Sequence, residues 1–273
     1  MITKEAYENY ILILNSELIE ALGCTEPIAI AYAAAKAKAV LGKLPERIEV
    51  GCSGNIVKNV KGVVVPNTGG LMGIAAAPVA GVVVGDPDKG LQVLESVKSE
   101  DYNKIRELLK KDYCAVYHLK GVENLYITVK VFSGDESAEV YIKDSHTNII
   151  EVVKNGEVVF RNDEGDKNSQ ISIGDRSLLS IKAIVEFAET VDLEELRELL
   201  ANQIRMNTAI SEEGLKKDYG VSVGKTLLKY YGNDIKVRAK AKAAAGSDAR
   251  MSGCSLPVVI NSGSGNQGIA ASV

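Results

Sequence analysis

The sequence predicts an α+β fold, in which a mainly helical catalytic frame carries a small inserted antiparallel β subdomain. Apolar residues recur at helical spacing near the start, where Ile11, Leu14 and Leu18 line one face, and again after residue 178. Between about 113 and 161 the pattern changes to strict alternation of apolar and polar residues, which is typical of strands. We therefore assign residues 1–112 and 175–273 to the helical frame, 113–162 to the β subdomain and 163–174 to a polar linker.

The first half of the frame is predicted to begin with a helix over 5–22, which Gly23 ends. A second helix follows at once over 25–42, because Thr25 can cap it and Pro27 suits its first turn. A strand is expected over 47–52, followed by a Ser-Gly-Asn turn. The run 71–84 predicts a buried helix, kinked near its proline.

The β subdomain and the second half of the frame follow in order. Asn155-Gly156 lies between two apolar runs and predicts a two-residue hairpin. Asp192 is placed to cap a helix, and further helices are expected over 212–231 and 234–245. The frame is expected to be incomplete at its C-terminal end, because the chain stops in an apolar run soon after a glycine-rich loop.

Composition excludes several classes of protein. The chain has 273 residues, of which 46% are apolar and 25% charged, and its net charge is −4, so neither nucleic acid nor an anionic membrane is an expected partner. The longest apolar stretch, 74–84, is too short to span a bilayer, and no secretion leader is recognised. We expect a cytoplasmic protein, and four scattered cysteines do not suggest disulfides there.

Cys24 is the most informative single residue, because it lies in the link between the first two helices. A thiolate at a helix N-terminus is stabilised by the helix dipole, which would make it a good metal ligand or nucleophile. The alternative is a small buried residue that closes a tight turn. One cysteine is not a metal site, which normally needs three or four ligands.

The loop near the C-terminus is rich in glycine and small polar residues. Such a loop can bring backbone N–H groups close to a carboxylate or phosphate, and it can also be a flexible turn. Its candidate substrate-binding residues are Asn261, Ser262, Ser264, Asn266 and Gln267.

Two other segments offer groups for a carboxylate. Arg250 could bind one bidentately with Asp248 holding the guanidinium in place and Ser247 nearby, although a surface ion pair is the common alternative. Ser53 and Asn55, in the turn after the first strand, form a possible ligand loop or only a turn.

His146 is the candidate catalytic base. It lies in a polar cluster between strands, where Thr147 and Asn148 are further candidate substrate-binding residues. His118 lies within a predicted strand and is read as structural. Among the other cysteines only Cys254, near the glycine-rich loop, is kept as an outside candidate for a ligand.

Four motifs in this order resemble the L-cysteine desulfidase family, which is related to the alpha part of bacterial iron–sulfur L-serine dehydratases. They are Ala21-Leu22-Gly23-Cys24-Thr25-Glu26-Pro27, Ser145-His146-Thr147-Asn148, Ser247-Asp248-Ala249-Arg250-Met251 and the stretch from Asn261 to Gly268. The resemblance implies a [4Fe-4S] cluster held by three cysteines, with one iron open to substrate. It also implies cleavage of L-cysteine to pyruvate, ammonia and sulfide without pyridoxal phosphate.

The resemblance assigns Cys24 to the cluster, and it places the other two cysteine ligands in a C-terminal region that is absent from this chain. A homo-oligomer, or a second chain supplying the C-terminal half, is therefore expected. Two alternatives remain open. The first is an L-serine dehydratase that uses either an iron–sulfur cluster or pyridoxal phosphate, and the second is a protein that binds a small amino acid without catalysis.

Overall fold

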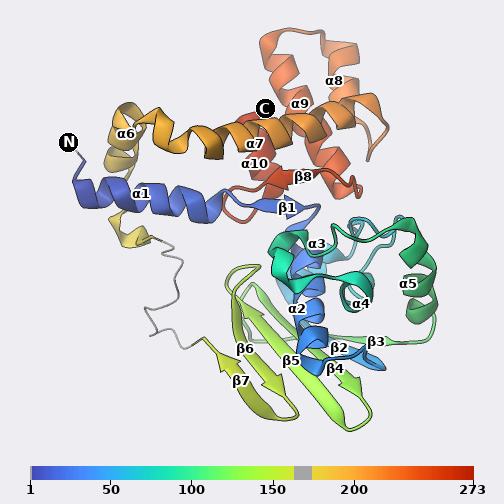
Figure 1. Ribbon diagram of the computed structural model, residues 1–273. Coiled ribbons are helices and arrows are strands. Elements are labelled where there is room, and N and C mark those ends of the chain that lie inside the picture. The colour runs from blue at the N-terminus through green and yellow to red at the C-terminus, as the bar shows by residue number, and fades with distance from the viewer. Residues whose placement is uncertain (1, 163–173) are drawn as a thin grey trace.

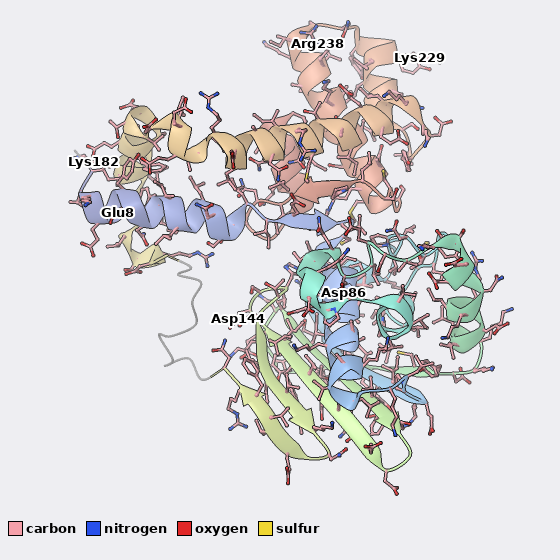
Figure 2. The ribbon with its side chains drawn as sticks, in the orientation of Figure 1. Glu8, Asp86, Asp144, Lys182, Lys229 and Arg238 are labelled. Carbon is pink, nitrogen blue, oxygen red and sulfur yellow. The ribbon has the colours of Figure 1, made fainter. Side chains whose placement is uncertain are left out.

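The computed structural model describes residues 2–162 and 174–273, and it confirms the α+β class. Figure 1 shows one group of elements built on a six-stranded sheet and a second group that is almost entirely helical. Charged side chains such as Glu8, Lys182 and Arg238 point outward from the helices in Figure 2. The predicted linker lies outside the described residues except for Gly174, and the division into domains stays a prediction.

The large sheet has the strand order β3-β2-β4-β5-β6-β7. Its strands are β2 (Arg47–Ser53), β3 (Cys114–Leu119), β4 (Tyr126–Ser133), β5 (Glu136–Lys143), β6 (Ile149–Lys154) and β7 (Glu157–Arg161). The sheet differs from the antiparallel one predicted, because β2 is inserted between β3 and β4 and pairs with β3 in parallel. The predicted Asn155-Gly156 turn joins β6 to β7, with both residues at positive φ.

One face of this sheet packs against α2 (Thr25–Leu41), as Figure 1 shows. Alternate residues of β4 are fully buried, namely Ile127, Val129 and Val131, and those between them are half-buried. Alternate side chains of a strand lie on one face of the sheet, and here α2 covers that face. On its other side α2 contacts α4 (Ala76–Val84). A Cβ added to Gly81 would lie 2.3 Å from the carbonyl oxygen of Ala31, so the two helices approach backbone to backbone.

Several elements of this group differ from the sequence expectations. The predicted Ser-Gly-Asn turn opens a helix, α3 (Gly54–Val60), and α4 begins late enough for Pro78 to fall in its first turn, where proline causes no kink. The remaining elements are α5 (Tyr102–Leu109) and the short 3₁₀ helices η1 (Pro87–Gln92) and η2 (Ser99–Asp101).

The helical group contains the N-terminal helix and the last hundred residues. Its elements are α1 (Lys4–Glu17), η3 (Arg176–Leu178), α6 (Ile181–Thr190), α7 (Leu193–Lys216), α8 (Val223–Tyr231), α9 (Ile235–Met251) and α10 (Gly265–Ser272). Asp192 caps α7 as predicted, accepting from the Glu194 N–H. None of the helices in the described residues combines the length and hydrophobicity that a membrane span needs.

The helix predicted over 5–22 is shorter than expected. It ends at Glu17, and Glu20–Leu22 form a strand, β1, that pairs antiparallel with β8 (Pro257–Val259). This two-stranded sheet brings the start of α2 next to the C-terminal segment. The link that holds Cys24 therefore lies where the two groups meet.

Candidate functional site

The cavity beside Cys24 has a volume of about 180 Å³. Segments far apart in the chain form its walls: the β1–α2 link, α3, the end of α9 and the glycine-rich loop. The lining residues are Cys24, Thr25, Glu26, Asn59, Arg250, Met251, Gly263, Ser264 and Asn266. The fold therefore brings residues of three of the sequence motifs to one place, with Arg250 and Met251 contributed by the third.

Cys24 lies at the start of α2, as predicted, and only 4% of it is exposed. It takes the cap position that was expected for Thr25, because α2 already begins at Thr25, and no side chain caps the helix there. Its Sγ donates to Glu26 Oε2 over 2.9 Å. Burial first, and then the negative charge of Glu26, raise the pKa of the Cys24 thiol to about 12. Burial and Glu26 thus act against the helix dipole and favour the protonated thiol, so the thiolate expected from the dipole needs a bound metal ion to form.

Glu26 accepts hydrogen bonds at both of its carboxylate oxygens. Its Oε1 accepts from Asn59 Nδ2 over 2.9 Å. The Thr25 hydroxyl, which has one proton, lies 3.3 Å from Glu26 Oε2 and 3.2 Å from the Gly263 carbonyl oxygen. Burial acts to raise the pKa of Glu26, but the hydrogen bond from Cys24 and the further contacts outweigh it, and the pKa is lowered.

Arg250 lies almost wholly inside the protein, with 3% exposed. Its Nε donates to the Gly23 carbonyl over 2.8 Å, and its Nη1 donates to Asn266 Oδ1 over 3.0 Å. A Cβ on Gly265 would lie 2.2 Å from that Nε, so only glycine lets the loop come this close. Burial lowers the pKa of Arg250, while Cys24 and Glu26 act against the shift, and an arginine remains charged at neutral pH.

His146 lies next to the loop, because a Cβ on Gly263 would be 3.6 Å from its Cε1. The ring is half-buried and forms no hydrogen bond within the described part of the chain. Burial first, and then the charge of Arg250, lower the pKa of His146, while Glu26 acts in the opposite direction. The imidazole is therefore neutral at neutral pH and has a nitrogen free to accept a proton.

Other predicted site residues have structural partners. Ser53 Oγ donates to the Asn124 carbonyl, Asp248 Oδ2 accepts from the Val223 N–H instead of holding Arg250, and Asn148 Nδ2 donates to the Lys143 carbonyl. Each of these contacts fixes a loop or a helix start.

The rest are on the surface or at the edge of the loop. Asn55, Thr147 and Gln267 are exposed, and Ser247 is half-buried within α9. Exposed Ser262 donates to Asn261 Oδ1. Ser264 caps α10 and also lines the cavity.

Sequence reasoning missed Thr25, Glu26, Asn59 and Met251 as wall residues. Thr25 and Glu26 follow Cys24 directly and Met251 follows Arg250, so these three lie in motifs recognised in the sequence and their position could have been inferred. Asn59 had no such signal, because it is 33 residues from Glu26 and reaches it only through the packing of α3.

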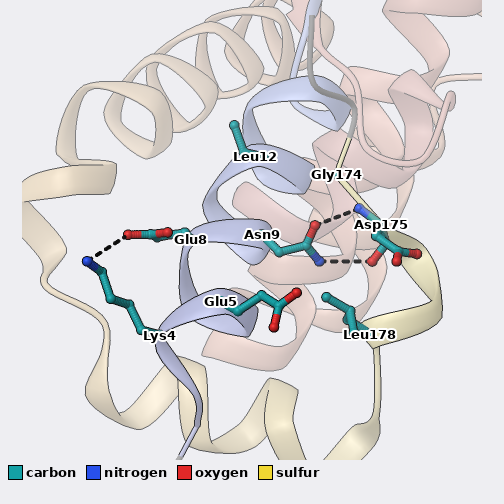
Figure 3. A pocket seen from close by; sticks show the side chains of 8 residues that line it. All are labelled: Lys4, Glu5, Glu8, Asn9, Leu12, Gly174, Asp175 and Leu178. Carbon is teal, nitrogen blue, oxygen red and sulfur yellow. Dashed lines mark hydrogen bonds and ion pairs between the residues drawn. The ribbon is translucent and has the colours of Figure 1, made fainter. Parts of the chain in front are cut away.

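A larger surface hollow of about 540 Å³ lies between α1 and η3 (Figure 3). Asn9 spans it, since its Nδ2 donates to the Asp175 carbonyl over 2.9 Å and its Oδ1 accepts the Asp175 N–H over 2.6 Å. Lys4 and Glu8 form an ion pair on the exposed side of α1. These contacts fasten η3 to α1, and the hollow contains none of the candidate residues.

Comparison with known proteins identifies related sequences. A family model described as serine dehydratase alpha chain matches residues 88–273. The UPF0597 proteins of Lachnoclostridium phytofermentans, Desulfitobacterium hafniense and Finegoldia magna are 50%, 50% and 51% identical over 267, 268 and 267 residues. These matches cover 98%, 98% and 97% of this chain, but only 64%, 62% and 63% of those proteins. No solved structure matches.

Proposed function

The chain belongs to the serine dehydratase alpha chain family, and from this premise we propose that it forms part of an iron–sulfur-dependent lyase. The reaction would be β-elimination on a small amino acid, with L-cysteine giving pyruvate, ammonia and sulfide. One observation carries the proposal: Cys24, Arg250 and Asn266 line a single small cavity, with His146 beside its loop.

The cavity suits a small amino acid in size and in charge. Its volume of about 180 Å³ is below the ~300–1,000 Å³ of sites that hold larger ligands. Arg250 donates from Nε to Gly23 and from Nη1 to Asn266 and to the Met251 sulfur, and its Nη2 has no hydrogen-bond partner in the described residues. That end of the guanidinium can donate to a substrate carboxylate, and Asn266 fixes its direction.

His146 is the proposed base. β-Elimination breaks the bond between the α-carbon and its hydrogen, and the proton passes to a neutral nitrogen of His146. The carbon–sulfur bond then breaks and its electron pair leaves with sulfur. The resulting aminoacrylate tautomerises to an imine, which water hydrolyses to pyruvate and ammonia.

The iron–sulfur cluster is only partly accounted for by this chain. Cys24 is the one cysteine that lines the cavity, and the described residues contain no group of three or more metal-binding side chains. Cys52 and Cys114 pair in the sheet with Ile127 and Ile48, and Cys254 is buried after α9. Cys24 fits one ligand position, and we propose that the others come from the part of the relatives' length that this chain does not span, or from a second chain.

The cluster, when bound, would act as a Lewis acid on the leaving group. The residues of this chain have the other tasks. Arg250 and Asn266 hold the carboxylate, His146 moves the proton, and Thr25 fixes the Gly263 loop beside the start of α2.

The test is turnover by the full-length protein, purified without oxygen and assayed for iron and acid-labile sulfide. Incubation with L-cysteine should yield equal amounts of pyruvate, ammonia and sulfide. Removal of iron should abolish turnover. Products formed by iron-free protein, or no products from iron-loaded protein with any small amino acid, would overturn the proposal.

L-Serine is the second candidate substrate, and the description of the matching family favours it. The same assay with L-serine should give pyruvate and ammonia without sulfide. The ratio of kcat/KM for the two amino acids decides between them. Binding of an amino acid without products would instead identify a non-catalytic binding protein.

A further inference from the structure

The cavity contains a carboxylate as well as a guanidinium. Glu26 and Arg250 both line it, and the negative charge of Glu26 acts on the guanidinium. No ion pair joins them in the part of the chain that the structure describes, since Arg250 bonds to Gly23 and Asn266 while Glu26 bonds to Cys24 and Asn59. Two opposite charges in one small cavity are thus left available to a ligand that has both.

We propose that Glu26 binds the α-ammonium group of the substrate, so that Glu26 and Arg250 together select an amino acid in its zwitterionic form. The inference rests on the proposed function and adds a specificity-determining residue to it. Arg250 faces the carboxylate and Glu26 the ammonium, and both groups are attached to the same carbon of an α-amino acid.

The hydrogen bonds of Glu26 hold it ready for this role. Asn59 Nδ2 occupies Oε1 at 2.9 Å, and Cys24 Sγ and the Thr25 hydroxyl lie 2.9 and 3.3 Å from Oε2. The Cys24 thiol gives up its proton when it binds iron, which opens an acceptor position at Oε2. A carboxylate has about four acceptor positions, so at least one remains for an ammonium donor. Because its partners come from both α2 and α3, the side chain needs little rearrangement when a ligand arrives.

An acid that lacks the amino group would leave the Glu26 charge without a partner in a largely enclosed site. Sites built to hydrogen-bond a substrate group reject analogues without it by ~10⁴-fold or more when fully buried. Glu26 is half-buried, so solvent weakens the effect. We expect discrimination of about 10- to 100-fold between otherwise identical ligands.

The experiment compares L-cysteine with 3-mercaptopropionate, which differs only by the missing amino group, in the full-length iron-loaded protein. The wild type should show a KM for L-cysteine at least about 10-fold below the inhibition constant of 3-mercaptopropionate. Glu26→Gln should raise the KM by about 10-fold or more and leave that inhibition constant within about 3-fold. Glu26→Asp should restore part of the preference, and exposed Glu157→Gln should behave as wild type.

The outcomes separate this inference from the proposed function. A wild type that neither binds nor cleaves an amino acid overturns both. A wild type that turns over L-cysteine, with an unchanged preference in Glu26→Gln, overturns only the role of Glu26. If Glu26→Gln loses iron because Glu26 touches Cys24, Asn59→Leu replaces it, since that change releases Oε1 without touching the thiol. It should then lower the preference at wild-type iron content, and an unchanged preference would overturn the inference.

Discussion

Replacement of Arg250 by alanine should destabilise the fold as well as weaken substrate binding. The guanidinium, 3% exposed, donates to the Gly23 carbonyl over 2.8 Å and to Asn266 Oδ1 over 3.0 Å. Alanine would leave the buried Gly23 carbonyl and the half-buried Asn266 Oδ1 without this donor, at a cost of about 1–3 kcal/mol each, or about 2–6 kcal/mol together. The Asn266 share lies at the low end of this range, because that side chain lines the cavity. The folded protein also pays a desolvation cost for burying the Arg250 charge, and alanine removes that cost. The net loss in the free energy of unfolding should therefore lie near the lower end of this range.

Urea unfolding of the full-length protein, followed by far-UV circular dichroism, measures this loss. Arg205→Ala is the matched control, because Arg205 is exposed on α7 and its removal should change the free energy of unfolding by less than about 0.5 kcal/mol. Asn266→Ala removes one acceptor and should cost less than Arg250→Ala. A loss below about 1 kcal/mol for Arg250→Ala would refute the structural role, since even one orphaned acceptor costs that much.

The effect of Arg250→Ala on substrate binding is separable from the effect on stability. Loss of a charge-assisted hydrogen bond of about 1.5–3 kcal/mol raises KM by about 10- to 150-fold. The assay is steady-state kinetics at a temperature where the variant is shown to be folded. An unchanged KM would remove Arg250 from the substrate site and leave it a purely structural residue.

Three further predictions concern other parts of the molecule. Cys24→Ala should lower the iron content of the anaerobically purified full-length protein to background, and Cys114→Ala should not; equal iron in both would exclude Cys24 as a ligand. Because burial lowers the pKa of His146, the acid limb of the pH profile of kcat/KM should lie below the ordinary histidine pKa of ~6.5. Activity falls as the pH drops through that pKa, since the protonated imidazole can no longer act as a base. An acid limb above pH 7 would contradict the assignment. Gly81→Ala should cost about 1–3 kcal/mol in urea unfolding by forcing α4 away from the α2 backbone, whereas Gly62→Ala, with open space around it, should cost almost nothing.

The sequence predicted those parts of the fold that are determined within a few residues. The cap at Asp192 and the Asn155-Gly156 turn need only neighbouring backbone groups, and both are present. Gly42 likewise ends α2 in the left-handed conformation. Such contacts leave a local pattern, because the residue type at one position decides the geometry.

Long-range pairing escaped prediction for a physical reason. Leu18 and Leu22 continue the apolar spacing of α1, but residues 20–22 pair with β8 more than 230 residues later. Nothing within that local segment encodes its partner. The insertion of β2 between β3 and β4 was missed for the same reason. Parallel strands are not joined by a hairpin turn, so no short turn motif in the sequence indicates that they pair.

The candidate site shows the same division. Its glycine-rich loop and Cys24 were recognisable by type, and the structure brings them into one cavity. The state of the Cys24 thiol was not predictable, because the dipole argument omits burial and the carboxylate of Glu26, which together raise the pKa to about 12. A metal ion would have to displace that proton, so metal binding at Cys24 is expected to weaken as pH falls.

The contacts of Arg250 couple assembly of the site to packing of the two groups of elements. Arg250 belongs to the helical group, and its acceptor Gly23 begins the segment that leads into α2 and the sheet. Thr25 at the start of α2 bonds back to Gly263 of the helical group. Separation of the two groups would therefore break the Arg250–Gly23 and Thr25–Gly263 hydrogen bonds and open the cavity at the same time. A ligand that bridges Glu26 and Arg250 must therefore also hold the two groups together, because it binds only where they meet.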